Sequence, residues 1–194
     1  PISRPTLTAE AVMQGFEAGG ALIEQPRLSI TLAPNGRGYQ GLARVAGAVS
    51  GQPLNASAAI ALADNAIALS DLDAQVGGLA AQGSASVTPR GVRADLDVSG
   101  QVDGVIPGAS GRFAGRVALT PEVLQLDAEI RDAQSGDLFV RAATLRARGP
   151  MRQINAEFDM RGRLRQAPLS FTGTAALDLQ DSSIQIDGRG ALAG

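Results

Sequence analysis

Apolar or small residues alternate with polar residues along most of the chain. In the stretch INAEFDMRGRL (154–164), Ile154, Phe158 and Met160 occupy even positions, whereas charged or amide side chains occupy the odd positions. A period of two places successive side chains on opposite faces of an extended strand. The pattern therefore predicts β-strands with one face of apolar side chains, here called the dry face, and one polar face, the wet face.

Turn signals divide residues 26–194 into about a dozen such strands. They recur roughly every 10–14 residues and include Asn35-Gly36, Asp64-Asn65, Pro89-Arg90-Gly91 and Gly149-Pro150. Connections this short join antiparallel neighbours, because parallel strands need a longer crossover. The sequence predicts an all-β, mainly antiparallel meander over 26–194.

The first 25 residues carry the one helix signal in the chain. Thr8 suits a helix N-cap, Gly19-Gly20 suits a helix end, and Val12, Met13 and Phe16 share one helical face. We predict a short helix over residues 8–18 within an N-terminal segment, 1–25, that precedes the strand-rich segment.

A dry face of this size has to be covered. One short helix cannot cover about a dozen strands, which at ~4.8 Å per strand extend over roughly 50 Å. The dry positions are mainly Ala, Gly, Val, Leu and Ile, and the chain has only five Phe and no Trp, whereas sandwich cores use aromatic side chains to fill the gap between sheets. Glycines recur in mid-strand, where they favour bending. We expect a sheet curled into an apolar groove. A closed β-sandwich or stalk-like structural module without ligand is the alternative.

A groove of this kind suits acyl chains, since aliphatic contacts have no preferred direction and allow sliding. The expected lining is a set of alternate apolar residues from the central and C-terminal strands: Leu96, Val98, Val117, Leu126, Ile154, Phe158, Met160, Leu169, Phe171, Ile184 and Ile186.

Composition argues against catalysis. The chain has no His and no Cys, so the commonest general base, the commonest metal ligands and the thiol nucleophile are missing. A carbohydrate-acting enzyme would need paired carboxylates in an aromatic-lined cleft, and we interpret pairs such as Asp95/Asp97, Asp71/Asp73 and Glu157/Asp159 as solvated sheet surface. We predict a protein that is not an enzyme and has no catalytic residues, metal or cofactor.

Charge adds one candidate site. The net charge is −2, and stacking aromatics are scarce, so we expect no nucleic-acid partner. Seven arginines lie between Arg141 and Arg165, against two acidic residues, Glu157 and Asp159. Such a cluster suits lipid headgroups or anionic polymers, but solvated sheet surface is the interpretation we favour.

Glycine-punctuated alternating strands, as in GQPLNASAAIALADNAIALSDLDAQVGGLAAQGSASV and RADLDVSGQVDG, resemble the AsmA/TamB family of bacterial envelope proteins. The nearest likeness is to the β-rich periplasmic segment of the inner-membrane subunit of the translocation and assembly module. The resemblance implies a repeating β-groove, or β-taco, that carries phospholipid between the two membranes and supports outer-membrane protein assembly with a barrel partner. It further implies a periplasmic location in a Gram-negative bacterium, as an internal segment of a longer protein anchored in the inner membrane.

Overall fold

The computed structural model describes residues 4–18, 21–49, 51–63, 65–103, 108–150, 152–178 and 183–192. Within these ranges the chain forms strands and turns without a helix, and no helix could therefore cross a membrane there. The strands are β1 (Leu7–Val12), β2 (Gly15–Ala18), β3 (Ala21–Asn35), β4 (Gly38–Val49), β5 (Gln52–Ala63), β6 (Ala66–Val76), β7 (Leu79–Thr88), β8 (Gly91–Gln101), β9 (Ala109–Leu119), β10 (Leu124–Ser135), β11 (Leu138–Gly149), β12 (Gln153–Leu164), β13 (Ala167–Asp178) and β14 (Ser183–Leu192).

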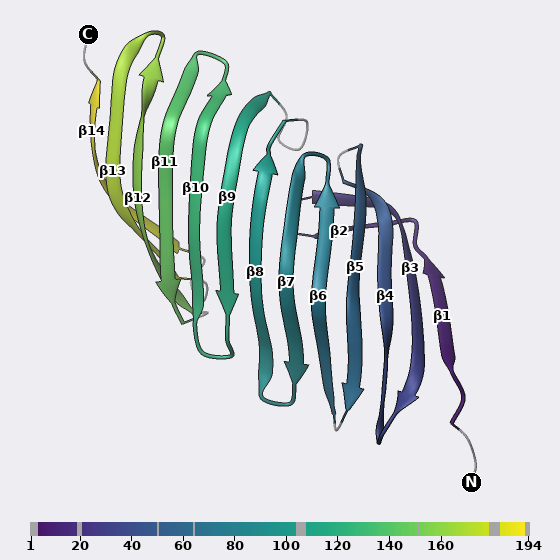
Figure 1. Cartoon of the computed structure of the whole chain (residues 1–194). Helices are drawn as coiled ribbons and strands as arrows, with labels where there is room; N and C mark the ends of the chain where they lie inside the picture. The colour runs from purple at the N-terminus through teal and green to yellow at the C-terminus, as the bar shows by residue number, and fades with distance from the viewer. Residues whose placement is uncertain are drawn as a thin grey trace.

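All described strands belong to one antiparallel sheet (Figure 1). From β3 to β14 each strand pairs with the next in sequence. The first strands divide the edge of β3 between them, because β2 pairs with its first part, Ala21–Glu24, and β1 with its second part, Arg27–Leu32. The predicted all-β antiparallel meander is confirmed.

The predicted helix over residues 8–18 is wrong. The structure places β1 and β2 there, and Leu7, Ala9 and Ala11 pair with residues of β3. The same residues alternate with Thr8 and Glu10, so the period of two continues into this segment. A helix of about three turns is marginal without an apolar surface to pack on, whereas the free edge of β3 satisfies the backbone groups of β1 directly.

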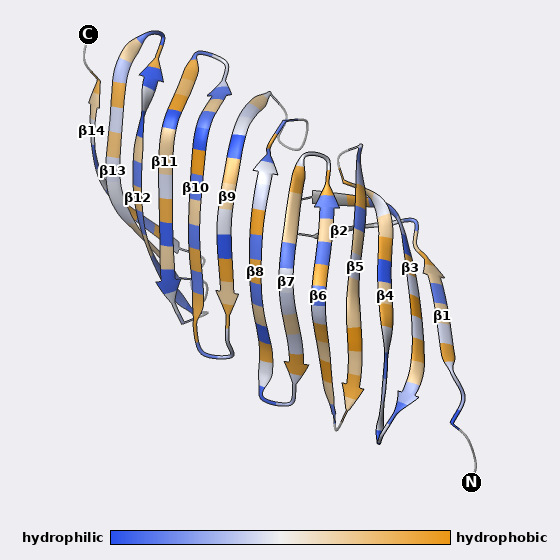
Figure 2. Cartoon of the chain, viewed as in Figure 1, coloured by the Kyte–Doolittle hydropathy of each residue, from blue (hydrophilic) through white to orange (hydrophobic). Residues whose placement is uncertain are grey.

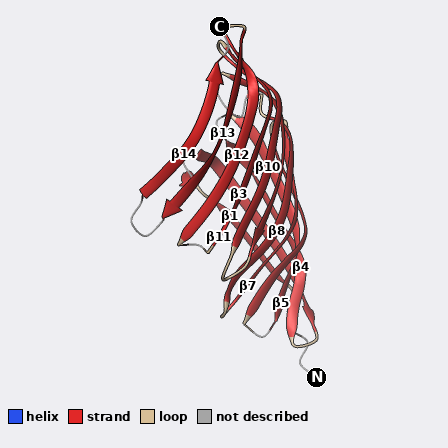
Figure 3. Ribbon diagram, turned by 90° about the vertical axis from the view of Figure 1, so that its left-hand side faces the viewer, coloured by secondary structure: helices blue, strands red, loops and turns tan. Residues whose placement is uncertain are grey.

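The sheet is open and curved, as the edge-on view in Figure 3 shows. The chain exposes 13,012 Å², whereas a compact monomer of this mass exposes about 8,600 Å². Among the described residues, the buried hydrophobic side chains are Leu32, Ala58, Val102 and Ile154, each 8% exposed or less. A closed sandwich would bury a second set of inward side chains, so the structure is a single curled layer.

Four irregularities interrupt the ladder. The register shifts once in each of β3, β6 and β10. At each of these places one residue adopts a positive φ, between 44° and 51°: Gln25 in β3, Asp71 in β6 and Asp132 in β10. A fourth shift lies between Val140 and Ala142 in β11. Each leaves one extra residue on its strand, and such β-bulges bend a strand and increase its twist. The bulges therefore contribute to the curl of the sheet.

Candidate functional site

An unbroken row of apolar residues and glycines crosses the whole sheet. Directly paired residues of antiparallel strands point to the same face, so the row can be followed from pair to pair. The row takes one residue from every strand of the pairing path from β1 to β14, which leaves out only β2. Figure 2 shows alternating bands of hydropathy along the same strands. This central dry row consists of Ala11, Leu28, Val45, Ala56, Ala74, Ala81, Val98, Gly115, Ala128, Leu145, Phe158, Gly173 and Gly188.

The structure brings all eleven predicted lining residues onto this face, in five adjacent rows. Val98 and Phe158 belong to the central dry row. The remaining nine lie in rows on either side of it: Leu96, Val117, Leu126 and Ile186 share one row, Met160 pairs with Phe171 in another, Leu169 pairs with Gly162, and Ile154 and Ile184 flank Leu177. Their placement on one face is a feature of the structure. Their contact with lipid stays a prediction.

Exposure along this face is uneven. Ile154 is 8% exposed, whereas Ile184 and Ile186 on β14 are 65% and 62% exposed. The other eight predicted lining residues are half-buried. The difference has a simple cause, because β14 is an edge strand with a neighbour on one side only. Most of the face is thus apolar and in contact with solvent, which is costly for surface of this extent.

Phenylalanine rings lie over the mid-strand glycines. The rings of Phe158 and Phe171 stack with centroids 5.2 Å apart and planes inclined by 21°. A Cβ atom at Gly173 would lie 2.7 Å from the Phe158 ring, and one at Gly188 would lie 2.9 Å from the Phe171 ring. The sequence interpretation of these glycines as bends was incomplete. They also make room for rings that cover the sheet as flat apolar plates.

Replacing Gly173 by alanine should therefore destabilise the protein. The new methyl group would meet the Phe158 ring and the carbonyl oxygen of Asp187, which lies 2.4 Å from the Cβ position. Overpacking of this kind costs about 2 kcal/mol, measurable as a lower urea midpoint with unchanged m-value. Ala175→Gly, two residues along the same strand, is the control and should also destabilise, by about 0.5–1 kcal/mol. A Gly173→Ala protein as stable as the parent would contradict the ring-over-glycine packing.

Several further residues on the dry face escaped the predicted set. Phe113 and Ile130 lie in the row of Met160 and Phe171. Their alternation was visible in the sequence. Leu145, beside Phe158 in the central dry row, lies on β11, where the bulge between Val140 and Ala142 disturbs the period of two. The sequence of β11 alternates less regularly than that of its neighbours for this reason.

The wet face carries an ordered pattern of charge. One row runs through Asp97, Arg116, Asp127, Arg146 and Glu157, with signs that alternate from strand to strand. Arg146 Nε lies 3.8 Å from Asp127 Oδ1. Opposite charges across strands stabilise a pair, whereas a slip of one residue would put this row on the dry face. The alternating row therefore helps to hold the register that keeps the dry face apolar.

Asp95 illustrates the electrostatics of this face. Arg116 donates from Nε and from a terminal nitrogen to the two carboxylate oxygens of Asp95, at 3.0 and 2.7 Å. These hydrogen bonds lower the pKa of Asp95 and raise that of Arg116. A lowered carboxyl pKa stabilises the folded state above the unfolded pKa, and this contribution is lost as pH falls through the folded pKa. Both groups are exposed, so the effect is screened by solvent.

The carboxylate pairs named in the sequence analysis lie on or beside the wet face, among basic side chains and at a bulge. Asp95 is held by Arg116, Asp159 has Arg161 at 3.5 Å, and Asp71 occupies a bulge in β6. In the part of the chain that the structure describes, no three His, Cys, Asp or Glu side chains come together as a metal site.

Comparisons with family models, curated proteins and solved structures returned no match for this chain. The resemblance to the AsmA/TamB family consequently stays a prediction, and the function of this chain has to be inferred from the geometry of its sheet.

Proposed function

We propose that the dry face binds phospholipid acyl chains and lets them slide across the sheet. On this proposal the protein is a non-enzymatic, lipid-conducting segment of a bacterial envelope protein. The central dry row carries the proposal, since it crosses thirteen strands without a polar residue and its side chains remain accessible. Twelve strand spacings of ~4.8 Å give a contour length of about 58 Å.

The energetics suit transport better than storage. Each methylene group removed from water contributes roughly 0.8 kcal/mol. Leucine, valine and alanine side chains offer no hydrogen bond that would fix an acyl chain at one position. The stacked Phe158 and Phe171 rings add a flat surface over which a chain can move. Meanwhile the charges of the wet face keep the opposite side of the same sheet hydrated.

The setting of this activity belongs to the same proposal. The AsmA/TamB resemblance supports a periplasmic position between inner and outer membranes, in a protein anchored in the inner membrane. It also supports a second role in outer-membrane protein assembly beside a barrel partner. The open dry face is compatible with such a bridge, because a lipid leaving a membrane needs a continuous surface that shields its chains from water.

Native mass spectrometry tests the proposal directly. Protein purified from membranes in mild detergent is expected to retain phospholipid, visible as mass additions that disappear after organic extraction. The wet face provides the control, because Thr174→Leu adds apolar surface there and should leave the lipid signal unchanged. A structural module without ligand would purify without lipid at every detergent concentration, and that result would reject the proposal.

A further inference from the structure

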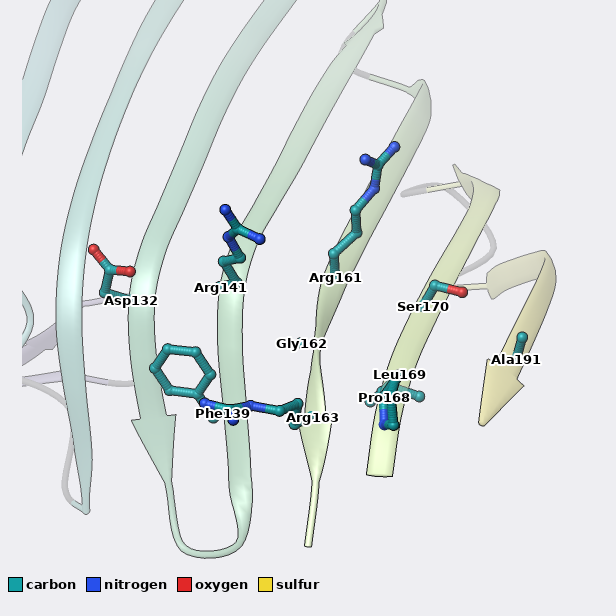
Figure 4. A pocket seen from close by; sticks show the side chains of 10 residues that line it. All are labelled: Asp132, Phe139, Arg141, Arg161, Gly162, Arg163, Pro168, Leu169, Ser170 and Ala191. Carbon is teal, nitrogen blue, oxygen red and sulfur yellow. The ribbon is translucent and has the colours of Figure 1, made fainter. Parts of the chain in front are cut away.

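A cavity of about 730 Å³ lies at one end of the wet face, across the strands from β10 to β14. Arg141, Arg161 and Arg163 line it together with Ser170, and Phe139 and Pro168 contribute apolar surface. Figure 4 shows the side chains of Arg141 and Arg161 extending in the same direction from neighbouring strands. The segment that appeared in sequence as solvated surface thus contains a concave site.

The cavity has a surplus of positive charge. Three arginines line it against one carboxylate, Asp132, which is paired with Arg112, and Arg161 lies 3.5 Å from Asp159 outside the lining. Arg163 lies over the Phe139 ring, with the guanidinium carbon 5.1 Å from the ring centroid. Arg141 has no hydrogen bond or ion pair among the described residues. Its guanidinium is therefore free to bind an anion.

The charge pattern of the wet face breaks down at this place. In the row from Asp97 to Glu157 the signs alternate, but the row containing Arg112, Arg131 and Arg161 holds no acidic residue. Arg112 and Arg131 are direct cross-strand partners, and each has a carboxylate partner outside the row, Asp132 for Arg112 and Glu129 for Arg131. This row therefore gathers basic side chains beside the cavity.

Two bulges shape the same wall. Asp132 is the extra residue of β10 relative to β9, and Arg141 is the extra residue of β11 relative to β12. The two residues lie at the same level of the sheet, between the pairs Arg131–Ala142 and Ala133–Val140. Bulges re-aim side chains and are over-represented beside functional sites. Here they direct the unpaired arginine into the cavity wall.

We propose that this cavity binds the phosphate group of an anionic ligand. Arginine guanidinium groups match phosphate oxygens in a bidentate geometry, the Ser170 hydroxyl can donate a further hydrogen bond, and Phe139 and Pro168 contact the carbon skeleton. The net charge of the chain is −2, so attraction comes from this cluster rather than from the protein as a whole. The charged lining lies on the face opposite the acyl-chain surface, although Gly162 and Leu169 of the dry face also line the cavity, and the proposal does not depend on the proposed function.

The test is a titration followed by backbone amide NMR, with three probes: inorganic phosphate, glycerol 3-phosphate, and phosphatidylglycerol in phosphatidylcholine vesicles. With the soluble phosphates, the amide chemical shifts of Arg141, Arg161, Arg163 and Ser170 are expected to change saturably. With the vesicles, the amide signals of the free protein are expected to disappear, because vesicle-bound protein tumbles too slowly to be observed. The Arg141→Gln/Arg163→Gln protein should bind at least about tenfold more weakly. Arg44→Gln/Arg93→Gln, which removes the same charge from exposed wet-face positions of β4 and β8, should bind like the parent. The amide spectrum of each variant also reports that it is folded.

The probes separate the two sources of phosphate. Binding of the soluble phosphates that is lost in the cavity variant supports a site for a free phosphate compound. Binding of vesicles alone, lost in the same variant, supports a lipid headgroup. Binding of none of the probes, or binding that the cavity variant retains, overturns the proposal.

Discussion

A carboxylate at position 98 is expected to weaken phospholipid binding by about a hundredfold while leaving the sheet folded. Val98 lies in the central dry row, near the middle of the sheet, between Ala81 and Gly115. An acyl chain on this row would desolvate the new charge, at a cost of several kcal/mol. In the lipid-free protein the small neighbours and the open face leave the Val98→Asp carboxylate in water, so folding is preserved.

The matched control is Ser99→Asp. It introduces the same charge one residue further along β8, on the wet face opposite Ala80 and Ala114. Lipid binding, measured for both variants by extraction of phospholipid from vesicles, should be unchanged in Ser99→Asp, and circular dichroism should show both variants folded. Normal lipid binding by folded Val98→Asp protein would mean that acyl chains do not use the central dry row.

Arginine at position 154 is expected to unfold the protein or to lower its free energy of unfolding by about 3 kcal/mol or more. Ile154 is 8% exposed and is one of the few buried side chains among the described residues. Its cross-strand partner is Leu177, which pairs in turn with Ile184. Water cannot reach a guanidinium at this position without displacing these neighbours. Urea denaturation measures the loss.

Ile186→Arg is the contrasting variant. Ile186 lies on the same dry face but is 62% exposed at the edge of the sheet, so its long side chain can extend into water. Its unfolding midpoint should stay close to that of the parent. Equal destabilisation at positions 154 and 186 would contradict the uneven burial of this face.

Alternation alone was sufficient to predict most strands, because a period of two is read directly from each segment and short turns require antiparallel neighbours. The N-terminal strand was missed for a reason that lies outside its own sequence. Thr8 and Gly19 are compatible with a helix, and the edge of β3 that β1 covers is formed by residues about twenty positions later. Local propensity was overridden by a pairing that only the whole sheet provides.

The finer features of the two faces were less accessible to sequence analysis. The alternating pattern identified the eleven dry-face residues, but not that Phe158 covers Gly173, since this contact depends on the register between β12 and β13. The bulge at Asp132 could not be located from sequence, and the one at Arg141 showed only as an irregular period in β11, because an extra residue is identified only against a neighbouring strand. The arginines were noticed in sequence, whereas their assembly around a cavity follows from those bulges.

Paramagnetic relaxation from a phospholipid with a spin label on its acyl chain tests the central claim most directly. If acyl chains occupy the dry face, methyl NMR signals of Leu96, Val117, Leu126 and Ile186, which share one row of that face, should lose most of their intensity. Methyl signals of Thr144, Thr172 and Thr174, on the wet face of neighbouring strands, should retain theirs. Equal broadening of the two sets, or broadening of neither at saturating lipid, would contradict the account.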